Sequence, residues 1–88
     1  MRHARDQDLD RIDPLLVRLR ALVPPLKERK RGSFYFKGKG FVHFHEDPKG
    51  MFADLRGVDG PDDRLQVDTS AEQDALIERA NEMLTALG

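Results

Sequence analysis

Residues 33–56, SFYFKGKGFVHFHEDPKGMFADLR, decide the fold, because apolar and polar side chains alternate along them and glycines separate the runs. A period of two is typical of half-buried strands, and a one-residue slip in pairing sends every side chain to the opposite face. A three-residue loop at 38–40, with Gly40 in the left-handed position of a bulge, pairs Phe36 with Val42. A two-residue turn at Gly38 and Lys39 would mix histidine into the phenylalanine face, so we expect the three-residue loop.

This register separates the side chains into two faces. The inward face is wholly apolar and holds Phe34, Phe36, Val42 and Phe44. The outward face holds Ser33, Tyr35, Phe41, His43 and His45. A four-residue loop at 47–50 leads into a third strand and pairs Val42 with Leu55, which extends the apolar face. On the outward face the same pairing sets His43 opposite Asp54 and His45 opposite Phe52.

Two amphipathic helices flank the predicted strands. Apolar residues at three and four spacing predict a helix over 13–23, with Asp13 as its N-cap and prolines at its end. A second helix follows residue 69 and closes at Gly88. Its capping box is formed by Thr69 with Glu72, or by Ser70 with Gln73.

The order of these elements predicts an α+β fold. We expect a two-layer sandwich of a helix, a three- or four-stranded antiparallel sheet and a second helix, with both helices on one sheet face. The fourth strand, at 64–68, is short. The 88 residues form a single domain, 1–88, in which we expect residues 1–6 to be frayed.

The composition narrows the classes of function. There is no cysteine, which excludes disulfides, thiolate zinc sites and nucleophilic thiols. No apolar run approaches the roughly 18 residues of a membrane helix, so we expect a cytoplasmic protein with no membrane partner. Neither a glycine-rich phosphate loop nor a nucleophile elbow is present, so we expect a non-enzymatic protein without a cofactor.

Charge is unevenly distributed along the chain. Residues 1–49 hold 12 Lys and Arg against 7 Asp and Glu, whereas residues 50–88 hold 3 against 9. Such asymmetry is typical of solvated helices of opposite sign. It also suits an anionic partner, or two subunits that meet through opposite patches.

Nothing in the chain covers the outward face, and we expect it to be a binding surface. The face carries Tyr35, Phe41, His43, His45, Phe52, Asp54 and Arg56. Monomers seldom leave a large contiguous apolar patch in water, so the first hypothesis is self-association as a homodimer.

Two alternatives use parts of the same surface. Aromatic side chains bounded by cations hold single-stranded nucleic acid in several small sheet domains. The cations in this hypothesis are Lys27, Arg29, Lys30, Arg31, Lys37 and Lys39. The other alternative is a metal site, because His43, His45 and Asp54 have the composition of a two-histidine, one-carboxylate centre.

The block from GSFYFKGKGFVHFHEDPKGMFADLR to the closing helix resembles small uncharacterised bacterial proteins of the YjbR type. The resemblance covers roughly residues 32–87 and consists of a sheet followed by a helix, although YjbR-type domains are usually longer. It implies a bacterial, intracellular protein of unknown function that associates with nucleic acid. It transfers no catalytic residue.

Overall fold

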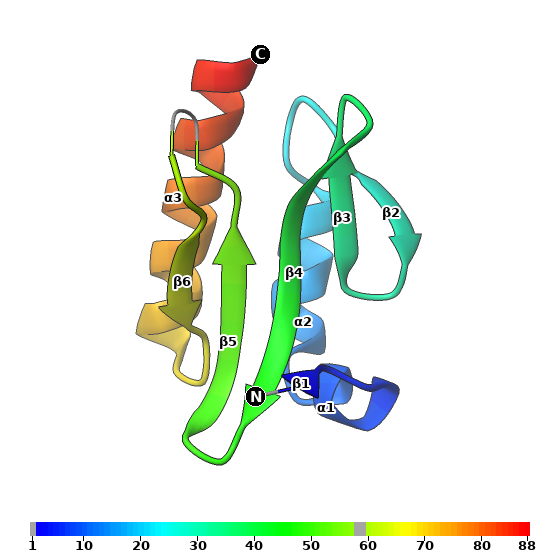
Figure 1. Ribbon diagram of the computed structural model, residues 1–88, viewed down its shortest axis with the longest axis vertical. Helices are drawn as coiled ribbons and strands as arrows, with labels where there is room; N and C mark the ends of the chain where they lie inside the picture. The colour runs from blue at the N-terminus through cyan, green and yellow to red at the C-terminus, as the bar shows by residue number, and fades with distance from the viewer. Residues whose placement is uncertain (1, 58–59) are drawn as a thin grey trace.

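The computed structural model describes residues 2–57 and 60–88, and Figure 1 views its sheet with the helices behind. The strands are β1 (Arg2–His3), β2 (Lys27–Lys30), β3 (Ser33–Phe36), β4 (Lys39–Asp47), β5 (Gly50–Leu55) and β6 (Asp63–Gln66). The helices are α1 (Asp6–Asp10), α2 (Asp13–Arg20) and α3 (Ser70–Leu87). The predicted α+β class and the antiparallel sheet are confirmed.

Within the described residues the sheet has six strands, which is more than the three or four that we predicted. Five follow the order β2-β3-β4-β5-β6, and β1 pairs with β4 off this path. β4 is the longest strand and pairs with β5 along most of its length. It pairs with β3 near its start and with β1 near its end, so these two share its other edge. Figure 1 shows both on that side of β4.

The two strands that sequence reasoning missed carry no apolar alternation. β2 has the sequence KERK, for which we predicted no strand and whose cations we assigned to a nucleic-acid surface, yet its backbone pairs with β3. The N-terminal segment was expected to be frayed. Instead Arg2 lies opposite Glu46 and His3 lies opposite His45, while Met1 lies outside the described residues. Backbone hydrogen bonding to a free sheet edge explains both strands without a side-chain pattern.

The predicted register of the first hairpin is wrong. The turn is a two-residue one at Lys37 and Gly38, with φ of +52° and +80°, and Gly40 is not left-handed. Turns with two positive φ values match the right-handed twist of the strands that they join. Tyr35 lies opposite Gly40 and Phe34 opposite Val42, so β4 has one extra residue, Phe41, at a bulge.

The bulge moves Phe41 off the outward face. Its side chain is only 1% exposed and belongs to the hydrophobic core, which corrects our placement of this ring on the binding face. The four residues predicted to face inward, Phe34, Phe36, Val42 and Phe44, are all buried as well. An inserted residue shifts the alternation once, which lets two consecutive residues of β4 face the core.

The β4–β5 pairing is as predicted. Val42 lies opposite Leu55, His43 opposite Asp54 and His45 opposite Phe52. This is the pairing that positions the candidate site. It has no bulge, so the period of two holds along the whole ladder.

The helices pack their leucines into the same core as the sheet. α2 contributes Leu15, Leu16 and Leu19, and α3 contributes Leu76, Ala80 and Leu84. α2 ends at Arg20, three residues earlier than predicted, and Ile12 rather than Asp13 is its N-cap. α3 begins as predicted, with Thr69 and Glu72 forming a reciprocal capping box.

Candidate metal centre

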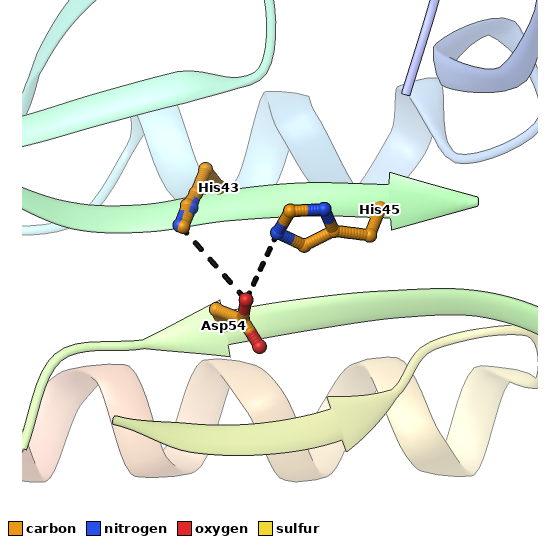
Figure 2. A group of neighbouring side chains, drawn as sticks. All are labelled: His43, His45 and Asp54. Carbon is orange, nitrogen blue, oxygen red and sulfur yellow. Dashed lines mark ion pairs between the residues drawn. The ribbon is translucent and has the colours of Figure 1, made fainter. Parts of the chain in front are cut away.

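Three side chains from neighbouring strands converge in front of the sheet in Figure 2. His43 and His45 stand two residues apart on β4, so strand alternation turns both to one face. Asp54 lies opposite His43 on β5. Nε2 of His45 is 2.9 Å from Oδ2 of Asp54, and Nε2 of His43 is 3.9 Å from the same oxygen. Figure 2 shows the dashed lines from both rings meeting at this oxygen.

The three groups are close to a coordination arrangement. One possible ligand atom from each residue lies within 4.8 Å of the other two. Ligands of a tetrahedral zinc, bound at about 2.0–2.1 Å, are separated by roughly 3.3 Å. The ligand atoms that are farthest apart therefore have to approach by up to about 1.5 Å, which side-chain rotations can supply because the strands already hold the backbones in register.

Asp54 has a second partner on β6. Arg64 donates from Nε to Oδ1 at 2.7 Å and from Nη2 to Oδ2 at 3.0 Å. These bonds hold the pKa of Asp54 below its ordinary value of 3.8, so the carboxylate is ionised at neutral pH. The bidentate pair fixes the plane of the carboxylate and also balances its charge.

One nitrogen of each histidine is buried and makes no hydrogen bond within the described residues. Burial, followed by the neighbouring His45, lowers the pKa of His43 below its ordinary value of 6.5, which favours the neutral ring that binds metals. Nδ1 of His43 and Nε2 of His45 are buried without a hydrogen-bond partner among residues 2–57 and 60–88. His45 is close to Asp54, but the oxygen lies outside the donor direction of the ring, so we treat their contact as electrostatic.

A third histidine, His3, lies beside this group. β1 sets it opposite His45, with the two ring centroids 4.8 Å apart, and its ring is 6.1 Å from that of His43. Sequence reasoning dismissed His3 as part of a frayed terminus. A two-residue strand offers no periodicity that could have revealed it. His3 does not belong to the group of ligand atoms within 4.8 Å.

The aromatic residues of the predicted binding face do not form an exposed platform. Phe41 is buried, and Tyr35 and Phe52 are half-buried. The guanidinium of Arg29 covers the ring of Tyr35 at 4.5 Å. Within the described ranges, the exposed large hydrophobic residues are Val17 and Val23, which lie in α2 and the segment after it.

Several cations of the predicted nucleic-acid surface are already engaged. Arg31 pairs with Asp10 at 2.8 Å and with Asp13 at 3.1 Å, and hydrogen bonds to these carboxylates raise its pKa. Lys37 donates to the backbone oxygen of Leu87 at 3.3 Å. Lys27, Arg29 and Lys30 are exposed along β2, at the edge of the sheet.

Comparison with known proteins does not assign the site, because no family model, no curated protein and no solved structure matches the chain. The resemblance to the YjbR type therefore stays a prediction. In the parts of the chain that the structure describes, no helix is both long and apolar enough to cross a membrane.

Proposed function

We propose that this protein binds a divalent transition-metal ion through His43, His45 and Asp54. The observation that carries the proposal is the convergence of two imidazoles and one carboxylate, with ligand atoms within 4.8 Å, on two adjacent strands. Imidazole and carboxylate together suit Zn²⁺, Ni²⁺ and Fe²⁺. The side chain of His43 is 38% exposed, so an ion can reach the group from solvent.

The unsatisfied nitrogens favour a metal over a purely structural network. Both oxygens of Asp54 accept hydrogen bonds from Arg64. Nε2 of His45, by contrast, is buried and makes no hydrogen bond within the described residues, although it lies 2.9 Å from Oδ2 of Asp54. A buried polar atom without a partner costs free energy, and a bound ion at Nε2 removes that cost.

Self-association and nucleic-acid binding, our other hypotheses, have less support. Self-association drew on the apolar area of Phe41, which is in the core. Nucleic-acid binding drew on exposed stacking rings and unpaired cations, and Arg31 is held by aspartates while Tyr35 is covered by Arg29. Both stay predictions.

Calorimetric titration of Zn²⁺ and of Ni²⁺ into the purified protein at neutral pH tests the proposal. We expect one site per chain. Loss of an outer partner of a metal ligand weakens affinity by about 10- to 100-fold, so His43→Ala and His45→Ala should each cost at least about tenfold.

His3→Ala is the matched control, because it removes a histidine that contacts His45 but lies outside the ligand group. We expect His3→Ala to change the affinity for the metal ion by less than about threefold, which is small compared with the effect of removing a ligand. No binding heat in the wild type would contradict the proposal. An equal loss in all three variants would reduce it to nonspecific histidine binding.

A further inference from the structure

A cavity of about 500 Å³ lies beside the metal centre. It forms because β3 and β1 pair with the two ends of one edge of β4, which leaves His43 and Phe44 between them. Figure 1 shows β3 diverging from β4 above β1. Small-molecule sites in proteins measure roughly 300–1,000 Å³, so this volume suits a small organic ligand.

The cavity and the metal centre share residues. His43 and Asp54 line the cavity, whereas His45 does not. An ion held by all three residues would therefore lie at the border of the cavity. Nδ1 of His43, buried without a partner among the described residues, lies on the same ring.

The wall across from His43 is held in place by charged contacts. The turn between β2 and β3 includes Arg31, which pairs with Asp10 and Asp13. The backbone N–H of Gly32 donates to Oε2 of Glu28 at 2.9 Å. The cavity is thus preformed, and a ligand would not need to order this turn.

One cation on that wall has no partner. Lys30 lines the cavity, and its side chain makes no hydrogen bond or ion pair with any residue in 2–57 or 60–88, unlike that of its neighbour Arg31. Phe34, Phe41 and Phe44 border the same cavity, but each of them is at most 3% exposed and packs into the core. Asp62 also lines it and lowers its positive potential, but Asp62 is exposed and contributes through solvent.

We infer that the cavity binds a small organic carboxylate, whose acid group lies between Lys30 and a metal ion on His43 and Asp54. The inference rests on the proposed metal site, which supplies the second anchor of the acid group. A carboxylate at that position would also compensate positive charge of the metal ion, because the charge of Asp54 is already neutralised by Arg64.

Benzoate is a suitable probe, with benzyl alcohol as its uncharged analogue. Each is titrated into zinc-loaded and metal-free protein while amide resonances are followed by NMR. We expect benzoate to shift the resonances of Ser33, Tyr35 and His43, and to bind the zinc-loaded protein more tightly than the metal-free one. Benzyl alcohol should bind more weakly than benzoate.

Lys30→Met and Lys27→Met are a matched pair, since both lysines are exposed on β2 and only Lys30 lines the cavity. An exposed ion pair is worth a factor of about two to five, so Lys30→Met should weaken benzoate by that much. Zinc affinity should be unchanged in both variants, and benzoate affinity unchanged in Lys27→Met.

The outcomes separate the two proposals. Zinc binding without benzoate shifts at the cavity residues overturns this inference and leaves the metal site standing. Equal affinity for benzoate and benzyl alcohol, or equal effects of the two lysine variants, also overturns it. An absence of zinc binding overturns both proposals.

Discussion

Replacing Phe41 tests the bulge in β4. It also tests whether the ring of Phe41 packs in the hydrophobic core or lies on the outward binding face. In the structure Phe41 is 1% exposed, its ring is 6.3 Å from that of Phe36, and the guanidinium of Arg56 lies 5.8 Å from its centre. We expect Phe41→Ala to destabilise the fold severely, and Phe41→Leu to destabilise it mildly.

The magnitude follows from burial. Phe→Ala substitutions in cores cost about 3–5 kcal/mol, which is a large part of the roughly 5–15 kcal/mol that keeps a domain folded. Phe41→Leu keeps most of the volume and should cost less than about 1.5 kcal/mol. With a urea slope of about 1 kcal/mol per M for so small a protein, that shifts the unfolding midpoint by up to about 1.5 M.

Urea unfolding followed by circular dichroism measures both variants, and light scattering after size exclusion measures their mass. Phe52→Leu is the control, because Phe52 is half-buried and lies opposite His45. A surface substitution stays within about 0.5 kcal/mol. If Phe41→Ala fell in that range while the protein changed from dimer to monomer, the burial of Phe41 at the bulge would be wrong and the self-association hypothesis would be favoured.

Two further predictions concern the charges of the site. Because burial lowers the pKa of His43, the unfolded chain takes up its proton first, so this histidine destabilises the fold as pH falls below about 6.5. His43→Gln should remove that part of the pH dependence of urea unfolding between neutral and mildly acidic pH. His45, Asp54, His3 and Asp62 still surround position 43 in this variant. An unchanged profile would refute the lowered pKa of His43. Asp54→Asn should weaken zinc by at least about tenfold in calorimetry and lower the urea midpoint, because it removes both a ligand and the anion that pairs with Arg64. Asp74→Asn breaks an exposed pair with Arg18 and should do neither; equal effects of the two would contradict the site.

The site residues could be predicted from the sequence because they depend on one regular ladder. Residues 42–47 of β4 pair with residues 50–55 of β5 one by one, without a bulge. A period of two then determines which residues share a face. His43, His45 and Asp54 follow from that pattern alone, whatever happens elsewhere in the sheet.

The first hairpin could not be predicted in the same way. Gly38 and Gly40 allow more than one tight turn, and the pattern of phenylalanines fits two registers that differ by a bulge. The two registers differ in whether Phe41 is buried in the core. The stability gained from that burial depends on tertiary packing, which the local sequence does not reveal. Strands β1 and β2 could not be predicted for a related reason, since backbone pairing to an existing sheet edge requires no apolar side chains.

The charge balance of the site links the metal to the cavity. Before a metal binds, ionised Asp54 and Arg64 neutralise one another. A divalent ion on His43 and His45 then adds two positive charges that these two side chains do not compensate. An anion in the adjoining cavity reduces this excess at short range, so it should raise the affinity for the metal. Because linkage is reciprocal, zinc must raise the affinity for the anion by the same factor. A metal site whose only carboxylate also pairs with an arginine leaves the positive charge of the ion uncompensated. A carboxylate ligand beside Lys30 would supply the missing negative charge.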